Sequence, residues 1–307
     1  MGILPINYLR GAENSSYSVC MTQTSYVAVA GATGTQGAAV VDALLARGLS
    51  VRALTRTPDS AAARSLAAAG ARVLAADFDD RESLDTALAG AAALFAMSTP
   101  FGTDLATEVR QGTALVEAAA DARVGHIVFT SAAHADRDTG IPHFDSKYRI
   151  ERRLAGLGVP WTVLGPAAFM ENYAGEWTLQ GLREGSFVLP MPPECPLALV
   201  PARDIGAFAA LALTRPDEFA GRRIDLASDT LTCPGIAEVL SSATGRPIGF
   251  RRLPLAEIEA YSADLAAMFR YFTETGLDID TAALRRDHPE VGWQDFAAWA
   301  HGRTWPL

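Results

Sequence analysis

The chain has few of the residues that hold small secreted domains or metal centres together. Its 307 residues include three cysteines, Cys20, Cys195 and Cys233, which lie far apart and form no Cys-x-x-Cys pair. An odd and scattered set of this kind argues against a disulfide framework and a structural zinc site. The five histidines form no His-x-x-x-His pair, so we expect no metal.

Long apolar runs and an excess of basic charge are also missing. No apolar run reaches the roughly 18 residues of a membrane-spanning helix, so we expect no membrane partner and a cytoplasmic protein. Lys and Arg total 26 against 35 Asp and Glu, which gives a net charge of −9. We expect no nucleic-acid partner, because binding to a phosphate backbone needs a basic surface. A local basic pocket for one phosphorylated ligand is compatible with this charge.

Two catalytic motifs are absent as well. The phosphate loop Gly-x-x-x-x-Gly-Lys-[Ser/Thr] does not occur, which argues against nucleotide hydrolysis. The nucleophile elbow Gly-x-Ser-x-Gly does not occur either, which argues against an α/β-hydrolase. Hydrophobic residues make up 49% of the chain and charged residues 20%, a composition typical of a globular protein with a large core.

From residue 26 onward, short apolar runs alternate with Ala- and Leu-rich stretches of helical length. Strands that are apolar throughout, such as VAVA and HIVF, are typical of a parallel sheet covered on both faces. We therefore expect an α/β fold with a Rossmann-type doubly wound parallel sheet. The predicted strands cover residues 26–30, 51–55, 72–76, 93–97, 126–130 and 161–164, and the predicted helices cover residues 35–47, 60–69, 81–89, 104–122 and 144–156.

After about residue 165, Pro and Gly become frequent and the regular alternation ends. This change predicts a smaller C-terminal α/β lobe. We assign residues 25–165 to the Rossmann domain, and 166–307 mostly to a lobe for a substrate or partner, with parts that return to the sheet. In this region we expect a strand at 223–226 and helices at 204–213, 234–244, 255–272 and 293–301.

Residues 1–24 differ from the rest of the chain. They have no sustained hydrophobic period, and a second methionine, Met21, stands shortly before the first strand. We interpret this stretch as a flexible leader or a misassigned start, because it lacks the apolar block of a signal peptide.

The strongest motif is YVAVAGATGTQG, in which Gly31, Gly34 and Gly37 follow a strand directly and open a helix. This is the context that a dinucleotide-binding loop requires. The glycines permit a sharp turn, a close approach to the pyrophosphate and tight helix packing. Backbone amides at the helix start favour the anion. The predicted cofactor-binding residues of this loop are Gly31, Thr33, Gly34, Thr35, Gln36 and Gly37.

The end of the second strand indicates which dinucleotide binds. An NAD site usually has Asp or Glu there, whereas an NADP site has Arg. Here the run is VRALTRTPD, with Arg56 where the acid would stand and Asp59 only later. We predict that Arg56 binds the 2′-phosphate of NADP(H); the alternative is a solvated arginine at a strand end.

Polar residues follow the third and fourth strands. Ligands of such sheets gather at the carboxyl ends of the strands. We therefore expect Asp77 and Phe78 near the adenine, and Ser98 and Thr99 near the nicotinamide ribose. Each of these residues could equally form a turn.

The glycine loop, the Leu-Thr-Arg run and the stretch PHFDSKYRIERRLAGLGVPWTVLGPAAFMENY together resemble the NmrA-like family. These proteins are atypical members of the short-chain dehydrogenase/reductase superfamily. The run LAAMFRYFTETGLDID is similar to the small lobe of that family. The resemblance implies NADP(H) in a cleft between the Rossmann domain and a small lobe. The family includes reductases and also sensors of the nicotinamide pool.

The resemblance also implies a role for Lys147. Short-chain dehydrogenases use Tyr-x-x-x-Lys, in which the lysine binds the nicotinamide ribose and the tyrosine donates a proton. Lys147 matches the lysine, but one helical turn earlier the chain has His143, and Tyr148 points about 100° away. His143 could donate the proton, since its unperturbed pKa is near 6.5, or it could be a polar residue at the helix start. Ser131 falls near the catalytic serine of the superfamily.

Phe169, Met170, Asn172 and Tyr173 follow the sixth strand. We predict that they line the substrate side of the cleft; the alternative is packing between the lobes.

Two functions remain open. A reductase would transfer hydride to a small carbonyl, enone, quinone or imine, which can manage with a weak acid or water. A non-catalytic NADP(H) sensor would act through a regulatory protein partner, and the missing tyrosine favours it.

Overall fold

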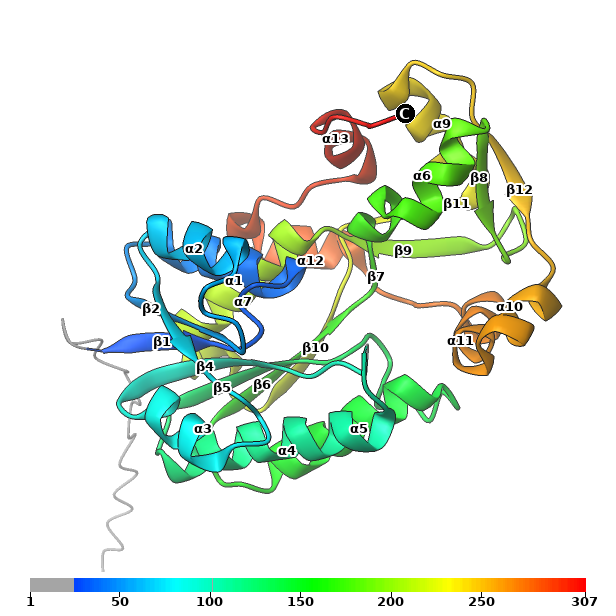
Figure 1. Ribbon diagram of the computed structural model, residues 1–307. Helices are drawn as coiled ribbons and strands as arrows, with labels where there is room; N and C mark the ends of the chain where they lie inside the picture. Colours follow the sequence, from blue (N-terminus) through cyan, green and yellow to red (C-terminus); the bar gives the residue numbers. More distant parts are fainter. Residues whose placement is uncertain (1–24, 101) are drawn as a thin grey trace, which may run out of the picture.

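The computed structural model describes residues 25–100 and 102–307, so the predicted leader at residues 1–24 lies outside the described residues. Within these ranges, seven strands form one parallel sheet (Figure 1). This arrangement confirms the predicted α/β fold. In spatial order the strands are β10 (Arg222–Leu226), β6 (Trp161–Pro166), β5 (His126–Thr130), β4 (Ala91–Met97), β1 (Tyr26–Val29), β2 (Val51–Thr55) and β3 (Arg72–Ala75).

The strand order reverses at β1, which the glycine loop follows. The chain runs outward from β1 through β2 and β3, then returns to place β4 on the other side of β1. Ligands of doubly wound sheets bind at such a reversal, outside the carboxyl ends of the strands. Residues 31–37 follow β1 and residues 98–100 follow β4. The fold therefore brings the ends of these two strands together at one edge.

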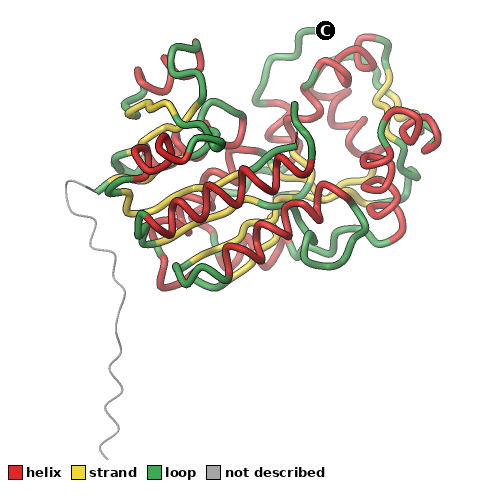
Figure 2. Tube along the Cα trace, turned by 60° about the horizontal axis from the view of Figure 1, so that its bottom comes forward, coloured by secondary structure: helices red, strands yellow, loops and turns green. Residues whose placement is uncertain are grey.

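Helices cover both faces of the sheet. One face carries α1 (Thr35–Leu45), α2 (Ala61–Ala68) and α7 (Ala202–Thr214), and the other carries α3 (Arg81–Leu88), α4 (Leu105–Asp121) and α5 (Pro142–Ala155) (Figure 1). The long α4 and α5 lie side by side in front of the strands in Figure 2. Both faces of β1 are buried as a result, which explains its uniformly apolar sequence YVAV.

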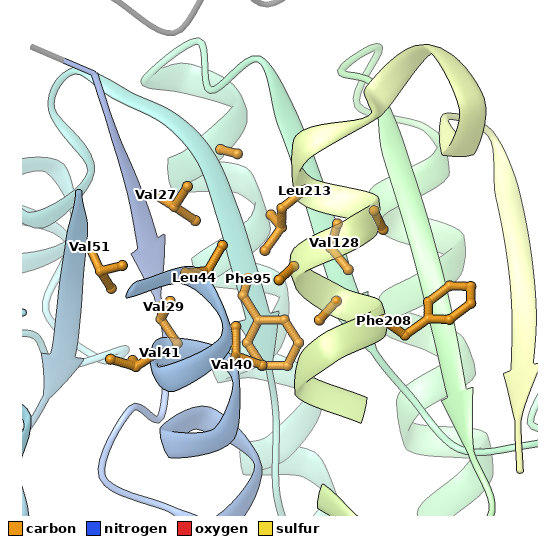
Figure 3. Packing of buried hydrophobic residues seen from close by; sticks show 14 of the residues in the cluster. Val27, Val29, Val40, Val41, Leu44, Val51, Phe95, Val128, Phe208 and Leu213 are labelled. Atoms are coloured by element: carbon orange, nitrogen blue, oxygen red, sulfur yellow. The ribbon is translucent and has the colours of Figure 1, made fainter. Parts of the chain in front are cut away.

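The core between α1, α7 and the sheet joins distant parts of the chain. Val40 and Leu44 of α1 lie with Phe95 of β4 between helix and sheet, whereas Phe208 lies on the far side of α7 (Figure 3), where its ring packs edge-on against Phe219. The two helices approach closely because Gly206 has no side chain: a Cβ there would lie 2.5 Å from the backbone of Ala39. Thus α7 and β10, which come from the C-terminal half, are part of the Rossmann sheet assembly.

The remaining C-terminal elements form a smaller lobe around its own apolar core. Among the described residues it contains a three-stranded sheet of β7 (Ala168–Phe169), β9 (Pro196–Val200) and β11 (Asp229–Thr232), and a pair of β8 (Ser186–Leu189) and β12 (Gly249–Arg252). Its helices are η1 (Met170–Ala174), α6 (Glu176–Arg183), α9 (Cys233–Thr244), α10 (Leu255–Tyr261), α11 (Ala263–Glu274) and α13 (Phe296–His301). Short elements elsewhere are α8 (Pro216–Phe219), α12 (Thr281–Asp287) and η2 (Pro289–Val291).

One predicted helix is divided in the structure. The stretch 255–272 forms α10 and α11, because Ser262 adopts an extended conformation between them. Its side chain accepts a hydrogen bond from the amide of Leu265 and so caps α11. No helix in the described part of the chain is long and apolar enough to cross a membrane.

Candidate functional site

The glycine loop has a shape that only glycine allows at two positions. Gly31 has a φ of +61°, and a Cβ there would lie 2.7 Å from Sδ of Met97. A Cβ at Gly37 would lie 2.2 Å from the carbonyl oxygen of Gly31. The amide of Gly34 donates to that same oxygen over 3.0 Å. The loop therefore folds back tightly against the start of α1.

Helix α1 offers a free positive end. Gly34 is its N-cap, and no side chain among the described residues caps it; its first turn holds no acidic residue. Uncapped amides and the helix dipole favour an anion at this end. Thr35 is exposed beside them, whereas the side chain of Gln36 is buried and donates to Oγ1 of Thr130 over 2.9 Å. Gln36 thus ties α1 to the end of β5, and its backbone faces the anion site.

Arg56 lies directly after β2, at the mouth of an open surface hollow. Thr55, the last residue of β2, lies 3.4 Å from Thr33 of the glycine loop, measured between their hydroxyl oxygens. Arg56 itself is exposed, and the hollow that it lines is also lined by Asp77. Arg56 therefore lies at the carboxyl end of β2, next in the chain to the residue that approaches the glycine loop. Asp77 shapes its own turn, since its carboxylate accepts the amide of Asp79 over 3.0 Å, and Phe78 packs partly against the core.

Lys147 is the single lysine of the chain, and all its other side chains of the Lys and Arg types are arginines. Its ammonium donates to Oε1 of Glu108 over 2.7 Å and to the carbonyl oxygen of Ser98 over 3.1 Å. Ser98 is the first residue after β4, so the ammonium lies at the carboxyl edge of the sheet. An ammonium is a compact charge, whereas guanidinium is a planar fork.

Glu108 of α4 is fully buried and is a functional candidate that the sequence analysis missed. Besides Lys147, it accepts hydrogen bonds from the hydroxyls of Ser98 over 2.9 Å and of Ser146. A buried carboxylate needs such partners, because desolvation otherwise costs several kcal/mol. Gly112, one turn later on α4, lets this helix approach α5 closely, since a Cβ there would lie 2.4 Å from Cδ1 of Ile150.

His143 lies one turn before Lys147 on α5 and contacts the small lobe. Its Nδ1 lies 2.5 Å from Oδ2 of Asp264, a residue of α11. Burial lowers the pKa of His143, and the carboxylate of Asp264 opposes this shift. His143 is therefore neutral near pH 7 and becomes charged only in the acid range.

Ser131 belongs to a different network. Its hydroxyl donates to the carboxylate of Glu151, which also pairs with Nε of Arg223 at 3.1 Å. Burial raises the pKa of Glu151, while Arg223 opposes the shift. The hydroxyl of Ser131 thus ties β5 to α5 and β10, and its predicted catalytic role stays a prediction.

The four predicted substrate-side residues separate into two pairs. Met170 and Tyr173 are buried in the core of the small lobe, where the Tyr173 ring packs edge-on against Phe187 and Phe296. For these two the structure supports packing, the alternative weighed above. Phe169 is half-buried and Asn172 is exposed, so these two side chains remain available to a ligand. The pairs follow from the 3-10 geometry of η1, in which residues three apart share a face. Met170 and Tyr173 therefore share the buried face, and Phe169 and Asn172 lie on another.

No cluster of three or more His, Cys, Asp or Glu side chains within residues 25–100 and 102–307 is arranged to hold a metal ion.

Comparison with known proteins gives the family. Residues 23–300 match the sequence model of the NmrA-like family. The chain belongs to this family. An NAD(P)H azoreductase of Xenophilus azovorans is 32% identical over 235 residues, which cover 75% of this chain and 78% of the azoreductase. The resemblance seen in the sequence is confirmed.

Two solved structures share the fold. An NADPH-dependent quinone oxidoreductase of Escherichia coli, complexed with NADPH, has a TM-score of 0.74 and 25% identity, over 90% of this chain and 99% of that one. Nmra, a negative transcriptional regulator in complex with NAD, has a TM-score of 0.77 and 21% identity, over 93% and 100%. One fold therefore serves an enzyme in one relative and a regulator in another.

The residues present fit a dinucleotide. A Cβ at Gly37 would meet the backbone of Gly31, so the loop packs tightly on the start of α1, whereas Gly34 is exposed and leaves the outer side of the loop open to a pyrophosphate. The start of α1 is uncapped among the described residues, and Arg56 follows Thr55, whose hydroxyl lies 3.4 Å from that of Thr33 in the loop. Lys147 lies at the end of β4, where the second half of a dinucleotide would lie.

Proposed function

We propose that this NmrA-like protein is an NADP(H)-dependent reductase that transfers hydride to a small carbonyl, enone, quinone or imine. The observation that carries the proposal is the ion pair of Lys147, the single lysine, with the fully buried Glu108. This pair lies at the carboxyl edge of the sheet, from which the glycine loop also starts. The azoreductase and the quinone oxidoreductase, both relatives of the chain, support a reductase that uses a small-molecule acceptor. Its separated cysteines fit a cytoplasmic location.

The cofactor, when bound, supplies the hydride. The amides of Thr35, Gln36 and Gly37 hold its pyrophosphate, with Gly31, Thr33 and Gly34 shaping the loop. Arg56 binds the 2′-phosphate, Asp77 and Phe78 border the adenine, and Ser98 and Thr99 border the nicotinamide ribose. Lys147 has three N–H donors, and two acceptors among the described residues take two of them. The third N–H donates to the nicotinamide ribose. Phe169 and Asn172 face the substrate that accepts the hydride.

A non-catalytic sensor is the second candidate. The observation that favours it is the absence of a tyrosine one turn before Lys147, because Tyr148 is exposed and His143 occupies that position. In this case the same cofactor site would control binding to a protein partner, as the likeness to the regulator Nmra suggests. The experiment that separates the two is NADPH absorbance followed against a panel of carbonyl, quinone, imine and azo compounds. Oxidation with at least one acceptor supports the reductase; tight NADPH binding with no oxidation supports the sensor.

Arg56→Ala is expected to weaken NADPH binding about 10- to 150-fold and to leave NADH binding nearly unchanged. The reason is that a charged hydrogen bond contributes about 1.5–3 kcal/mol, and NADH lacks the 2′-phosphate. Calorimetry with both cofactors measures the difference. Arg47→Ala is the matched control, because Arg47 is an exposed arginine that donates to the carbonyl of Ala43 at the far end of α1. Equal losses for NADPH and NADH would remove Arg56 from the site.

A further inference from the structure

His143 and Asp264 are joined across the two lobes by two contacts. The imidazole Nδ1 lies 2.5 Å from Oδ2 of Asp264, and the backbone amide of His143 donates to Oδ1 over 2.9 Å. Helix α5 of the Rossmann domain supplies the histidine, and the first turn of α11 in the small lobe supplies the aspartate. A carboxylate facing Nδ1 requires a proton on that nitrogen. The close carboxylate therefore favours the tautomer with the proton on Nδ1, which leaves Nε2 as the second ring nitrogen.

The helix places this imidazole beside the cofactor edge. Residues four apart on a helix lie on the same face. His143 precedes Lys147 by four residues, so the two side chains share one face of α5. Lys147 in turn bonds to the carbonyl of Ser98 at the end of β4. The imidazole thus belongs to the same face of α5 as the ammonium that we assign to the nicotinamide ribose.

The surroundings of His143 suit a group that gains and loses a proton. Its side chain is 15% exposed, whereas Asp264 is 31% exposed and borders water. Burial lowers the pKa of His143 first, and the Lys147 ammonium on α5 lowers it further. Asp264 on α11 and Glu108 on α4 raise it. His143 can therefore be charged in the acid range and recharged from the solvent side.

We propose that Asp264 is a positioning residue that makes His143 the proton donor of the site, so that the acid is assembled from both lobes. The inference rests on the proposed reductase function. The hydride adds to one atom of the acceptor double bond, and the π electron pair moves to the other atom. That atom takes the proton from Nε2 of the imidazolium, and the neutral imidazole regains a proton from water. One hydride and one proton reduce one double bond.

The pH dependence of turnover is the expected signature. Only the charged imidazole donates, so kcat rises as the pH falls through the pKa of His143, below the ordinary value of about 6.5. His143→Gln removes this rise and lowers kcat at about pH 5–6 by about 100-fold or more. Asp264→Asn removes the negative charge that stabilises the imidazolium, so the rise moves to lower pH. Asp264→Glu keeps the negative charge, so its rise in kcat lies close to the pH of the wild-type rise.

Two measurements test the pair. The first is kcat against pH with saturating NADPH and a quinone or enone acceptor. The second is an NMR titration of the His143 imidazole in the protein without cofactor, assigned by its loss in His143→Gln. His126 does not interfere, because burial lowers its pKa to about 4. The matched control is Asp278→Asn, since Asp278 of the small lobe pairs with His134 at 2.7 Å and does not contact His143.

The inference predicts that Asp264→Asn shifts both the titration and the kcat profile to lower pH, whereas Asp278→Asn shifts neither. It is overturned, with the reductase intact, if His143→Gln keeps the wild-type profile, or if Asp264→Asn titrates like the wild type. In that case the contact only joins the lobes, and its loss lowers the melting temperature alone. If the wild type binds NADPH but reduces no acceptor at any pH, the reductase proposal fails and this inference fails with it.

Discussion

Lys147→Met is expected to lower kcat about 100- to 10,000-fold while changing the dissociation constant of NADPH much less. The ammonium is held by Glu108 and Ser98 at the end of β4. In the proposed function it orients the nicotinamide ribose from there and adds positive charge beside the reacting atoms. Positioned groups of this kind contribute about two to four orders of magnitude in rate. A single ribose contact is only a small part of binding the whole cofactor.

Two further variants make this prediction specific. Lys147→Arg keeps the charge but replaces a compact ammonium by a planar fork, so we expect most of the loss to remain. Arg149→Met removes a positive charge from an exposed position on the same helix and should leave kcat unchanged. Full activity in Lys147→Met, measured by NADPH absorbance, would remove Lys147 from the chemistry.

The same substitution is expected to lower the free energy of unfolding by about 3–5 kcal/mol. Glu108 has no exposed surface, so the loss of Lys147 leaves a buried carboxylate with only the hydroxyls of Ser98 and Ser146 to bond it among the described residues. Breaking a buried pair by removing one partner costs about this much, whereas replacing both partners is often neutral. Urea unfolding of Lys147→Met, Glu108→Gln and the double variant that combines them measures the difference in the free energy of unfolding.

The double variant Lys147→Met/Glu108→Gln supplies the control. We expect it to recover most of the stability lost in Lys147→Met, because no charge is left buried. A strong coupling between the two sites in a double-mutant cycle follows from their contact. Additive losses would mean that the two side chains do not interact in solution.

The sequence predicted those parts of the fold that repeat a local pattern. Apolar strands such as VAVA, alternating with amphipathic helices, indicated the parallel sheet, and the strand at 223–226 was expected beyond the Rossmann domain. The break at Ser262 could not be seen from hydrophobic period, since both α10 and α11 continue the same apolar pattern. The small lobe was harder still, because its strands pair over long distances: β8 at residue 186 pairs with β12 at residue 249.

The site divides in the same way. The glycine loop is continuous in sequence, so its shape requirements at Gly31 and Gly37 could be predicted. Glu108 and Asp264 were missed because they meet α5 across 39 and 121 residues. A signal for Glu108 was present, since it shares the apolar face of its helix with Gly112 and Leu115, and a charge on a core face needs a partner. Asp264 stands in a first helical turn, where acidic residues are common, and gave no such signal.

The central claim, that this edge of the sheet delivers a hydride, is tested most directly by isotope transfer. NADPH carrying deuterium at both C4 positions is incubated with the protein and an enone acceptor, and the product is analysed by mass spectrometry. The account predicts one deuterium on carbon in the product formed by the wild type, and a rate at least about 100-fold lower with Lys147→Met. A wild-type protein that binds NADPH tightly, yields no deuterated product across enone, imine and carbonyl acceptors and oxidises no NADPH with quinones would contradict the account and leave the sensor.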